Sequence, residues 1–112
     1  MKSINRVTLL GNLEKDPELR TIGDGTSVVS CVMATTETFK DKNGEKKEQT
    51  EWHNLVLWRS LAEVFAQYCK KGDTVHIDGK LRTRNWEAQD GSKRYMAEII
   101  VDDFILVSKK TQ

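Results

Sequence analysis

The sequence predicts an all-β domain that carries a single short helix. Three observations support this: most of the chain alternates with period two, turn-forming pairs with glycine separate the alternating runs, and only residues 60–71 show helical periodicity. With 112 residues the chain is long enough for one domain with its own core. We therefore expect one domain over residues 1–108, followed by a polar stub at residues 109–112.

The N-terminal half predicts a meander of three strands. Residues 4–13 alternate, residues 18–22 suit a short extended piece, and residues 26–39 form a long β candidate. The charged segment that follows contains Asn43-Gly44, a strong hairpin signal. The chain then enters a third strand at residues 51–58, which is rich in β-branched and aromatic residues.

Residues 60–71 predict the one helix. Ser60 and Glu63 have the spacing of a capping box, and Gly72 suits the position after the last turn. Apolar residues recur at i, i+3, i+4 and i+7, which predicts one buried stripe, namely Leu61, Val64, Phe65 and Tyr68.

After the helix the chain returns to period two. Residues 74–86 and 95–101 predict two strands joined by a turn at Asp90-Gly91, with a possible extension through residues 104–107. Three strands, one helix and two strands are the order of a five-stranded antiparallel Greek-key barrel of the OB type, with one α-helix between strands 3 and 4. Parallel α/β folds need more than one helix.

Composition excludes several classes of function. No apolar run is long enough to span a membrane, and residues 1–6 lack the apolar core of a secretory signal, so we expect a cytoplasmic protein. Cys31 and Cys69 are expected to be reduced core residues, since neither has metal-site spacing. His53 and His76 accompany no nucleophile motif, and no glycine-rich phosphate loop is present. We expect neither an enzyme nor a cofactor.

The strand at residues 51–58 has two unlike faces. Leu55 and Leu57 form a plausible core face together with His53. The opposite face carries Trp52 and Trp58, and two tryptophans on one face indicate an interface or a stacking platform. Packing under a loop is the alternative for either indole.

A second strand adds positive charge to an aromatic residue. One face of residues 74–86 carries Lys80, Arg82, Arg84 and Trp86. Grooves for single-stranded nucleic acid combine cations that follow the phosphates with aromatic rings on which bases stack. Together with Trp52 and Trp58, and with Phe39 as a weaker candidate, this face predicts such a groove. The alternative is a strand charged only for solubility.

The sequence resembles the bacterial single-stranded DNA-binding (SSB) protein family. The motifs that carry the resemblance cover nearly the whole chain: N-R-V-T-L-L-G-N-L-x-x-D-P-E-L-R at residues 5–20, E-Q-T-E-W-H at 48–53, L-A-E-V at 61–64, Y-C-K-K-G-D-T-V-H-I-D-G-K-L-R-T-R-N-W at 68–86 and R-Y at 94–95. The resemblance implies an OB fold, a homotetramer around which single-stranded DNA wraps, and a bacterial, nucleoid-associated location in the cytoplasm.

The resemblance also implies individual site residues. The stacking aromatics fall on Phe39, Trp52, Trp58 and Trp86. The phosphate contacts fall on Arg6, Arg20, Lys40, Lys42, Lys71, Arg82, Arg84 and Arg94. Asn54, Ser60 and Asn85 stand where the family commonly has Arg or Lys. The sequence ends at Lys109-Lys110-Thr111-Gln112, without the acidic tail that recruits replication and repair proteins in the family, so such partners are not assumed.

These observations predict sequence-tolerant binding that protects single-stranded DNA during replication, recombination and repair. Two alternatives stay open within the same fold, a dimeric primosome-type OB protein and an RNA-binding, cold-shock-like chaperone. A purely structural OB module is a third.

Overall fold

A computed structural model describes residues 1–110, so the last two residues of the predicted stub at 109–112 lie outside the described part. The described residues form six strands and one helix. In chain order they are β1 (Val7–Leu13), β2 (Glu18–Ile22), β3 (Thr26–Lys40), β4 (Lys46–Trp58), α1 (Arg59–Tyr68), β5 (Thr74–Glu87) and β6 (Lys93–Ser108).

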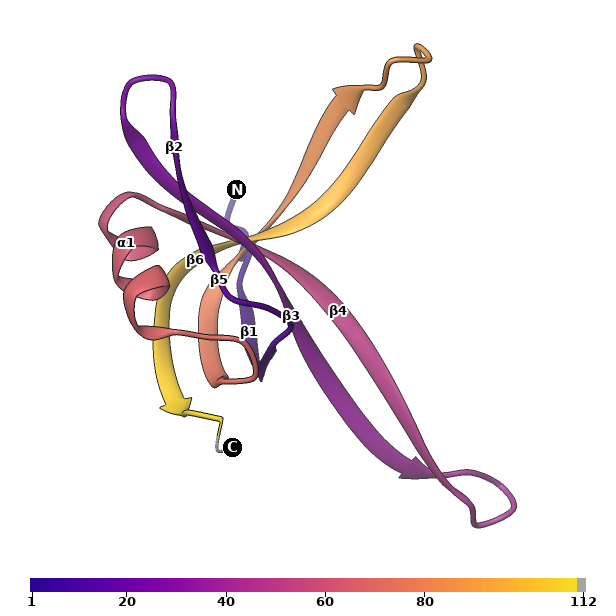
Figure 1. Ribbon diagram of the computed structural model, residues 1–112. Helices are drawn as coiled ribbons and strands as arrows, with labels where there is room; N and C mark the ends of the chain where they lie inside the picture. Colours follow the sequence, from indigo (N-terminus) through magenta and orange to yellow (C-terminus); the bar gives the residue numbers. More distant parts are fainter. Residues whose placement is uncertain (111–112) are drawn as a thin grey trace.

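Five of the strands close into a barrel with the single helix beside it (Figure 1). The sheet order is β1-β5-β6-β4-β3-β2, and β1 also pairs with β3 through Asn12 and Leu13, which closes the ring. This confirms the predicted barrel. The short extended piece predicted at residues 18–22 is β2, which adds to the outer edge of β3 and is not part of the ring.

The prediction that the barrel is antiparallel throughout is wrong at one pairing. Strands β4 and β6 run parallel where they meet, through Leu55 opposite Ile99 and Val56 opposite Ile100. The reason is geometric. In a closed ring with an odd number of strands, neighbours cannot alternate in direction all the way round, so at least one pair must be parallel.

The strand bounds differ most at the two hairpins. β3 and β4 stay paired out to Lys40 and Lys46, and β5 and β6 stay paired out to Glu87 and Lys93. Both pairs therefore project from the barrel as two-stranded arms (Figure 1). We call them the β3–β4 arm and the β5–β6 arm. By contrast, β1 begins only at Val7, three residues later than predicted.

The predicted helix forms, but both of its ends differ from the predicted ones. It runs from Arg59 to Tyr68. Its N-cap residue is Trp58, which makes no side-chain hydrogen bond to the helix, so the predicted capping box does not form. A capping box needs a non-helical residue at its start, whereas Ser60 already lies inside the helix. At the other end the chain leaves the helix at Cys69, before Gly72 is reached.

The helix buries only part of the predicted stripe: Phe65 is in the core and Leu61 packs against it, but the other two predicted residues are not buried. Ala62 and Phe65 are fully buried, while Val64 and Tyr68 are exposed. Phe65 packs edge-on against Phe104 of β6, with ring centroids 4.9 Å apart. Ala62 was missed because a small alanine contributes little to a hydrophobic pattern in the sequence.

Both cysteines are buried and free, as predicted. They belong to the main core inside the barrel, together with Met33, Leu55 and Leu57. Burial raises the pKa of the Cys31 thiol to about 12 and that of Cys69 to about 11. The reactive form of a cysteine is the thiolate, so these side chains serve as packing groups.

Two glycines allow neighbouring strands to come into close backbone contact in the barrel wall. A Cβ on Gly11 would collide with the carbonyl oxygen of Ala34, at the point where β1 turns from β5 towards β3. A Cβ on Gly79 would collide with the carbonyl oxygen of Ile100, beside a register shift between β5 and β6. Such shifts bend a strand, and here the bend closes the barrel.

A buried carboxylate joins the end of the chain to the turn after the helix. Asp73 is 2% exposed, and its two oxygens accept hydrogen bonds from the backbone N–H groups of Lys70 (2.8 Å) and Lys110 (3.0 Å). The ammonium group of Lys109 lies 3.1 Å away. Burial alone would raise the pKa of Asp73, but these donors outweigh it, and the pKa lies below its ordinary value.

Candidate nucleic-acid interface

One face of the sheet is hollowed into a groove whose walls come from β2, β3, β4, β5 and β6. The larger of two adjoining cavities measures about 500 Å³ and the smaller about 360 Å³, both within the range of ligand pockets. They share Arg20, Ser30, Arg84 and Glu98 in their walls, so we treat them as one continuous groove.

The groove is built from rows of residues that cross the strands. Trp58 of β4 pairs with Val28 of β3, which pairs with Arg20 of β2. The next row runs through Val56 to Ile100 of β6. Val28, Val56 and Ile100 form a small buried apolar cluster, separate from the main core. They provide an apolar floor, with polar and aromatic side chains around it.

The predicted outer face of β4 is confirmed by this arrangement. Val56 and Trp58 line the larger cavity and Asn54 lines the smaller, while Leu55 and Leu57 point into the core and are fully buried. His53, on the core side, is half-buried and lies 2.8 Å from the hydroxyl of Thr35.

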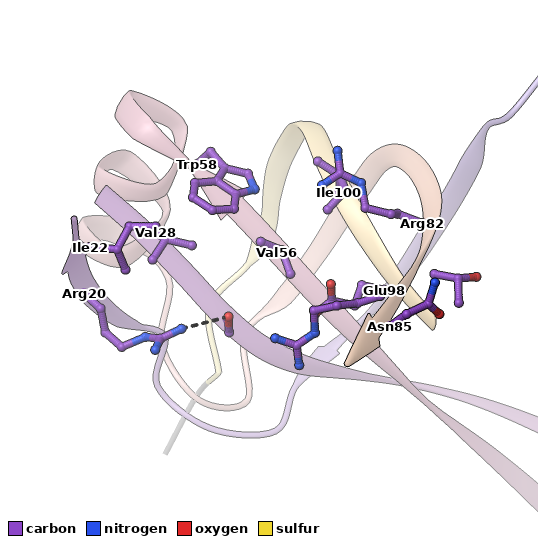
Figure 2. Close-up of a pocket in the computed structure, with 12 residues that line it drawn as sticks. Arg20, Ile22, Val28, Val56, Trp58, Arg82, Asn85, Glu98 and Ile100 are labelled. Carbon is purple, nitrogen blue, oxygen red and sulfur yellow. Dashed lines mark hydrogen bonds and ion pairs between the residues drawn. The ribbon is translucent and has the colours of Figure 1, made fainter. Parts of the chain in front are cut away.

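Four of the predicted site residues meet in the groove. They are Arg20, Trp58, Arg82 and Arg84. In the view of Figure 2, Arg20 and Trp58 lie on one side of Val56 and Arg82 lies on the other. Arg20 donates a hydrogen bond to the hydroxyl of Ser30 (3.3 Å), which holds its guanidinium at the groove wall.

Trp86 and Arg94 extend this surface along the β5–β6 arm. They face each other across the strands, and the guanidinium of Arg84 lies 5.1 Å from the centroid of the Trp86 ring, within cation–π range. Arg94 is paired with Asp90 at 3.6 Å. The alternation predicted for Arg82, Arg84 and Trp86 is therefore correct.

The β3–β4 arm holds the next group of predicted residues. Trp52, 58% exposed, lies opposite Ala34 partway along the arm, and Phe39 lies opposite Lys47 near its end. Lys40 ends β3 and Lys42 lies in the exposed hairpin loop. None of these lines the groove. Trp52 and Lys40 lie on one face of the arm, and Phe39, an odd number of positions from Ala34, lies on the other face.

Two predicted residues lie apart from the groove and from both arms. Arg6 is exposed just before β1, and Lys71 lies in the turn after the helix, where its backbone N–H donates to Asp16 (2.7 Å). The structure therefore does not bring all twelve predicted residues into one site.

The groove also contains residues that the sequence prediction did not include. Lys15 and Met96 line the smaller cavity, and Glu98 lines both. Tyr95, 67% exposed, lines a further hollow of about 280 Å³ beside Trp86 at the end of the β5–β6 arm. Tyr95 carried a signal, since it directly follows Lys93-Arg94. The sequence around Glu98 gave no indication of a site, because Glu98 stands alone within an apolar run.

The chemistry available here is binding. Guanidinium groups suit phosphates, and exposed aromatic rings suit the flat faces of bases. Among residues 1–110 no cluster of His, Cys, Asp or Glu could hold a metal ion. Within the same residues the one helix is too short and too polar to cross a membrane.

Comparison with known proteins agrees with this geometry. A family model described as the single-strand binding protein family matches residues 4–107. The single-stranded DNA-binding protein 1 of Xylella fastidiosa (strain 9a5c) is 44% identical over 111 residues, which are 98% of this chain and 82% of that protein.

Two solved structures are similar in fold. A Plasmodium falciparum SSB in complex with single-stranded DNA is 29% identical, with a TM-score of 0.87 over 96% of this chain and 98% of that one. A deletion mutant of the single-stranded DNA-binding protein of Thermus aquaticus is 26% identical, with a TM-score of 0.81. There the match covers 94% of this chain and 51% of the other.

Proposed function

The chain belongs to the single-strand binding protein family, and from this premise we propose that it binds single-stranded DNA in the groove and along the two arms. The observation that carries the proposal is the meeting of Arg20, Trp58, Arg82 and Arg84 around one apolar floor. These residues come from three different strands and line one groove. Charges placed only for solubility would not need to converge in this way.

The proposed path of the strand follows the distribution of cations and rings. Bases would stack on Trp58 and Trp86 in and beside the groove and on Trp52 and Phe39 along the β3–β4 arm. Phosphates would meet Arg20, Arg82 and Arg84, with Arg94, Lys40 and Lys42 extending the path. Arg6 and Lys71 remain proposed contacts of a strand that wraps further round the molecule. Stacking is independent of base identity, so we infer tolerance of sequence.

We further infer that residues 1–108 form the binding domain, as a Greek-key OB barrel with the helix in the connection between β4 and β5. The protein acts as a non-enzymatic, cytoplasmic protector of unpaired DNA in replication, recombination and repair. The family membership and the groove support this inference.

The test of the proposed function is a salt-dependent binding titration. Wild-type protein should bind labelled oligo-dT, with affinity falling linearly on a log–log plot against salt concentration, and should bind duplex DNA poorly. Each phosphate contact contributes about 0.7 to the slope for a single strand. Arg82→Ala and Arg84→Ala should each reduce the slope by about that amount. Glu63→Gln, on the exposed helix surface, is the control. Equal affinity for duplex and single strand would contradict the proposal.

An RNA-binding chaperone is the alternative that the same titration can decide. Oligo-U of equal length competes with oligo-dT for the same surface. Preference for the DNA strand supports the proposed function, and preference for RNA supports the alternative.

We also propose a homotetramer, on the evidence of an apolar row on the outside of the barrel. Leu10 of β1 lies opposite His76 of β5, which lies opposite Ile105 of β6. Leu10 is 57% exposed and Ile105 is 59% exposed, and Val107 beside them is exposed as well. Clustered exposed apolar residues mark interaction surfaces. None of these residues lines the groove, so an assembly through this surface does not use the groove residues.

Substitution of Ile105 tests the assembly. The wild-type chain should have the native mass of four copies, and Ile105→Glu should shift it to a smaller species, because a carboxylate buried in an apolar contact is costly. Native mass spectrometry at several protein concentrations measures this. Val64→Glu, at an exposed apolar site on the helix, is the matched control. A wild-type dimer would favour the primosome-type alternative.

A further inference from the structure

Glu98 is an acidic residue in the wall of a groove that otherwise carries positive charge. Its side chain is 11% exposed, and it lines both cavities. In Figure 2 it lies on the same side of Val56 as Arg82 and Asn85. Its cross-strand partner on β5 is Arg82.

The carboxylate of Glu98 has only one weak partner among the described residues. The Nε atom of Arg84 lies 3.8 Å from Oε2, which is beyond hydrogen-bond distance. The guanidinium of Arg84 is more than half exposed and also faces the ring of Trp86. A nearly buried carboxylate thus keeps acceptor capacity that the protein does not use. Among the described residues no buried side-chain oxygen lacks a hydrogen-bond partner, so the unpaired oxygens of Glu98 are open to the groove. A donor group on a ligand in the groove can therefore reach them.

The surroundings decide which part of a DNA strand could supply that partner. A phosphate would be repelled by the carboxylate, and the apolar floor of Val28, Val56 and Ile100 suits a base. An ionised carboxylate only accepts hydrogen bonds. The exocyclic amino group of cytosine is a donor that glutamate accepts from, and adenine and guanine also carry amino groups. Thymine and uracil present carbonyl oxygens there, which a carboxylate disfavours.

From this geometry we propose that Glu98 is a specificity-determining residue, which makes the groove favour a base with an exocyclic amino group over thymine or uracil. The proposal rests on the proposed function, since it requires DNA in the groove. It predicts one base-selective position within a surface that is otherwise tolerant of sequence.

The test compares oligo-dC with oligo-dU of equal length, because these bases differ at the amino group and neither carries the thymine methyl. The ratio of dC affinity to dU affinity should be higher in wild type than in Glu98→Gln by about 10- to 150-fold, which is the scale of one hydrogen bond to a charged group. Glutamine keeps the shape of the side chain, and its amide can donate to the carbonyl oxygen of uracil. In Glu98→Gln the affinity for oligo-dC should therefore fall and the affinity for oligo-dU should rise, and both changes lower the ratio. Glu63→Gln should leave the ratio unchanged.

A second measurement needs no variant. Oligonucleotides in which cytosine is replaced by pyrimidin-2-one lack only the amino group, and wild-type protein should bind them more weakly than oligo-dC by a similar factor. If Glu98 merely held Arg84 in place, Glu98→Gln would weaken all strands equally and the pyrimidin-2-one strand would bind like oligo-dC. That outcome would overturn the inference and leave the proposed function intact. Failure of wild type to bind any strand would overturn the proposed function itself.

Discussion

Replacement of Trp58 by alanine should weaken binding of single-stranded DNA by about 5- to 150-fold, which corresponds to the loss of about 1–3 kcal/mol from one stacked base. Trp58 is the predicted stacking residue that lies inside the groove, beside the apolar floor and across from Arg82. Anisotropy of a labelled oligo-dT measures the loss without depending on tryptophan fluorescence.

Two controls separate stacking from folding. Trp58→Phe keeps a flat ring and should remain within a few-fold of wild type. Trp58 is only 37% exposed, so Trp58→Ala should also lower the unfolding midpoint, and binding is therefore compared at a temperature well below the midpoint of each variant. Wild-type affinity in the alanine variant would show that the indole packs against the groove wall without contacting a base.

Replacement of Asp73 by alanine should lower the free energy of unfolding by about 2–4 kcal/mol, because two part-buried hydrogen bonds to a carboxylate are lost, from the N–H groups of Lys70 and Lys110, each worth about 1–2 kcal/mol. The ion pair with Lys109 adds little, since that side chain is 58% exposed. Urea denaturation at neutral pH measures the difference. Glu63→Ala, at an exposed helix position, should change stability far less.

The contribution of Asp73 should also depend on pH, with a sign that follows from its lowered pKa. A carboxyl whose pKa is lower in the folded protein stabilises it fully above the unfolded value of about 3.9 and loses that effect as pH falls through the folded value. The gap in stability between wild type and Asp73→Ala should therefore narrow below about pH 4. A gap that stays constant on acidification would contradict this account.

The strands and the groove-facing side of β4 were predictable because both follow from local alternation. Trp58 and Val56 are two positions apart on one strand and so share a face, independently of the tertiary structure. Closure of the barrel determines that this face lines the groove. Arg82 and Arg84 follow the same rule on β5. Which residues of one strand share a face was therefore predicted correctly, and their contacts with DNA stay a prediction.

What could not be predicted depends on contacts between distant segments. The groove position of Glu98 arises because β6 meets β4 and β5 at once, and nothing in its neighbours Ala97 and Ile99 indicates it. The buried stripe of the helix likewise depends on which face meets the barrel. The parallel pair of β4 and β6 reflects closure of the ring, which no single strand encodes.

Closure of the barrel through β1 has a consequence for the newly made chain. Val7 pairs with Gly79, so the first strand has no partner on that side until most of the domain has left the ribosome. The β3–β4 arm, by contrast, pairs neighbouring segments and can form early, since contacts close in sequence form faster. During synthesis the unpaired edge of β1 is therefore open to other chains. Completion of β5 ends that exposure, and the ring closes only when β6 joins β5 to β4.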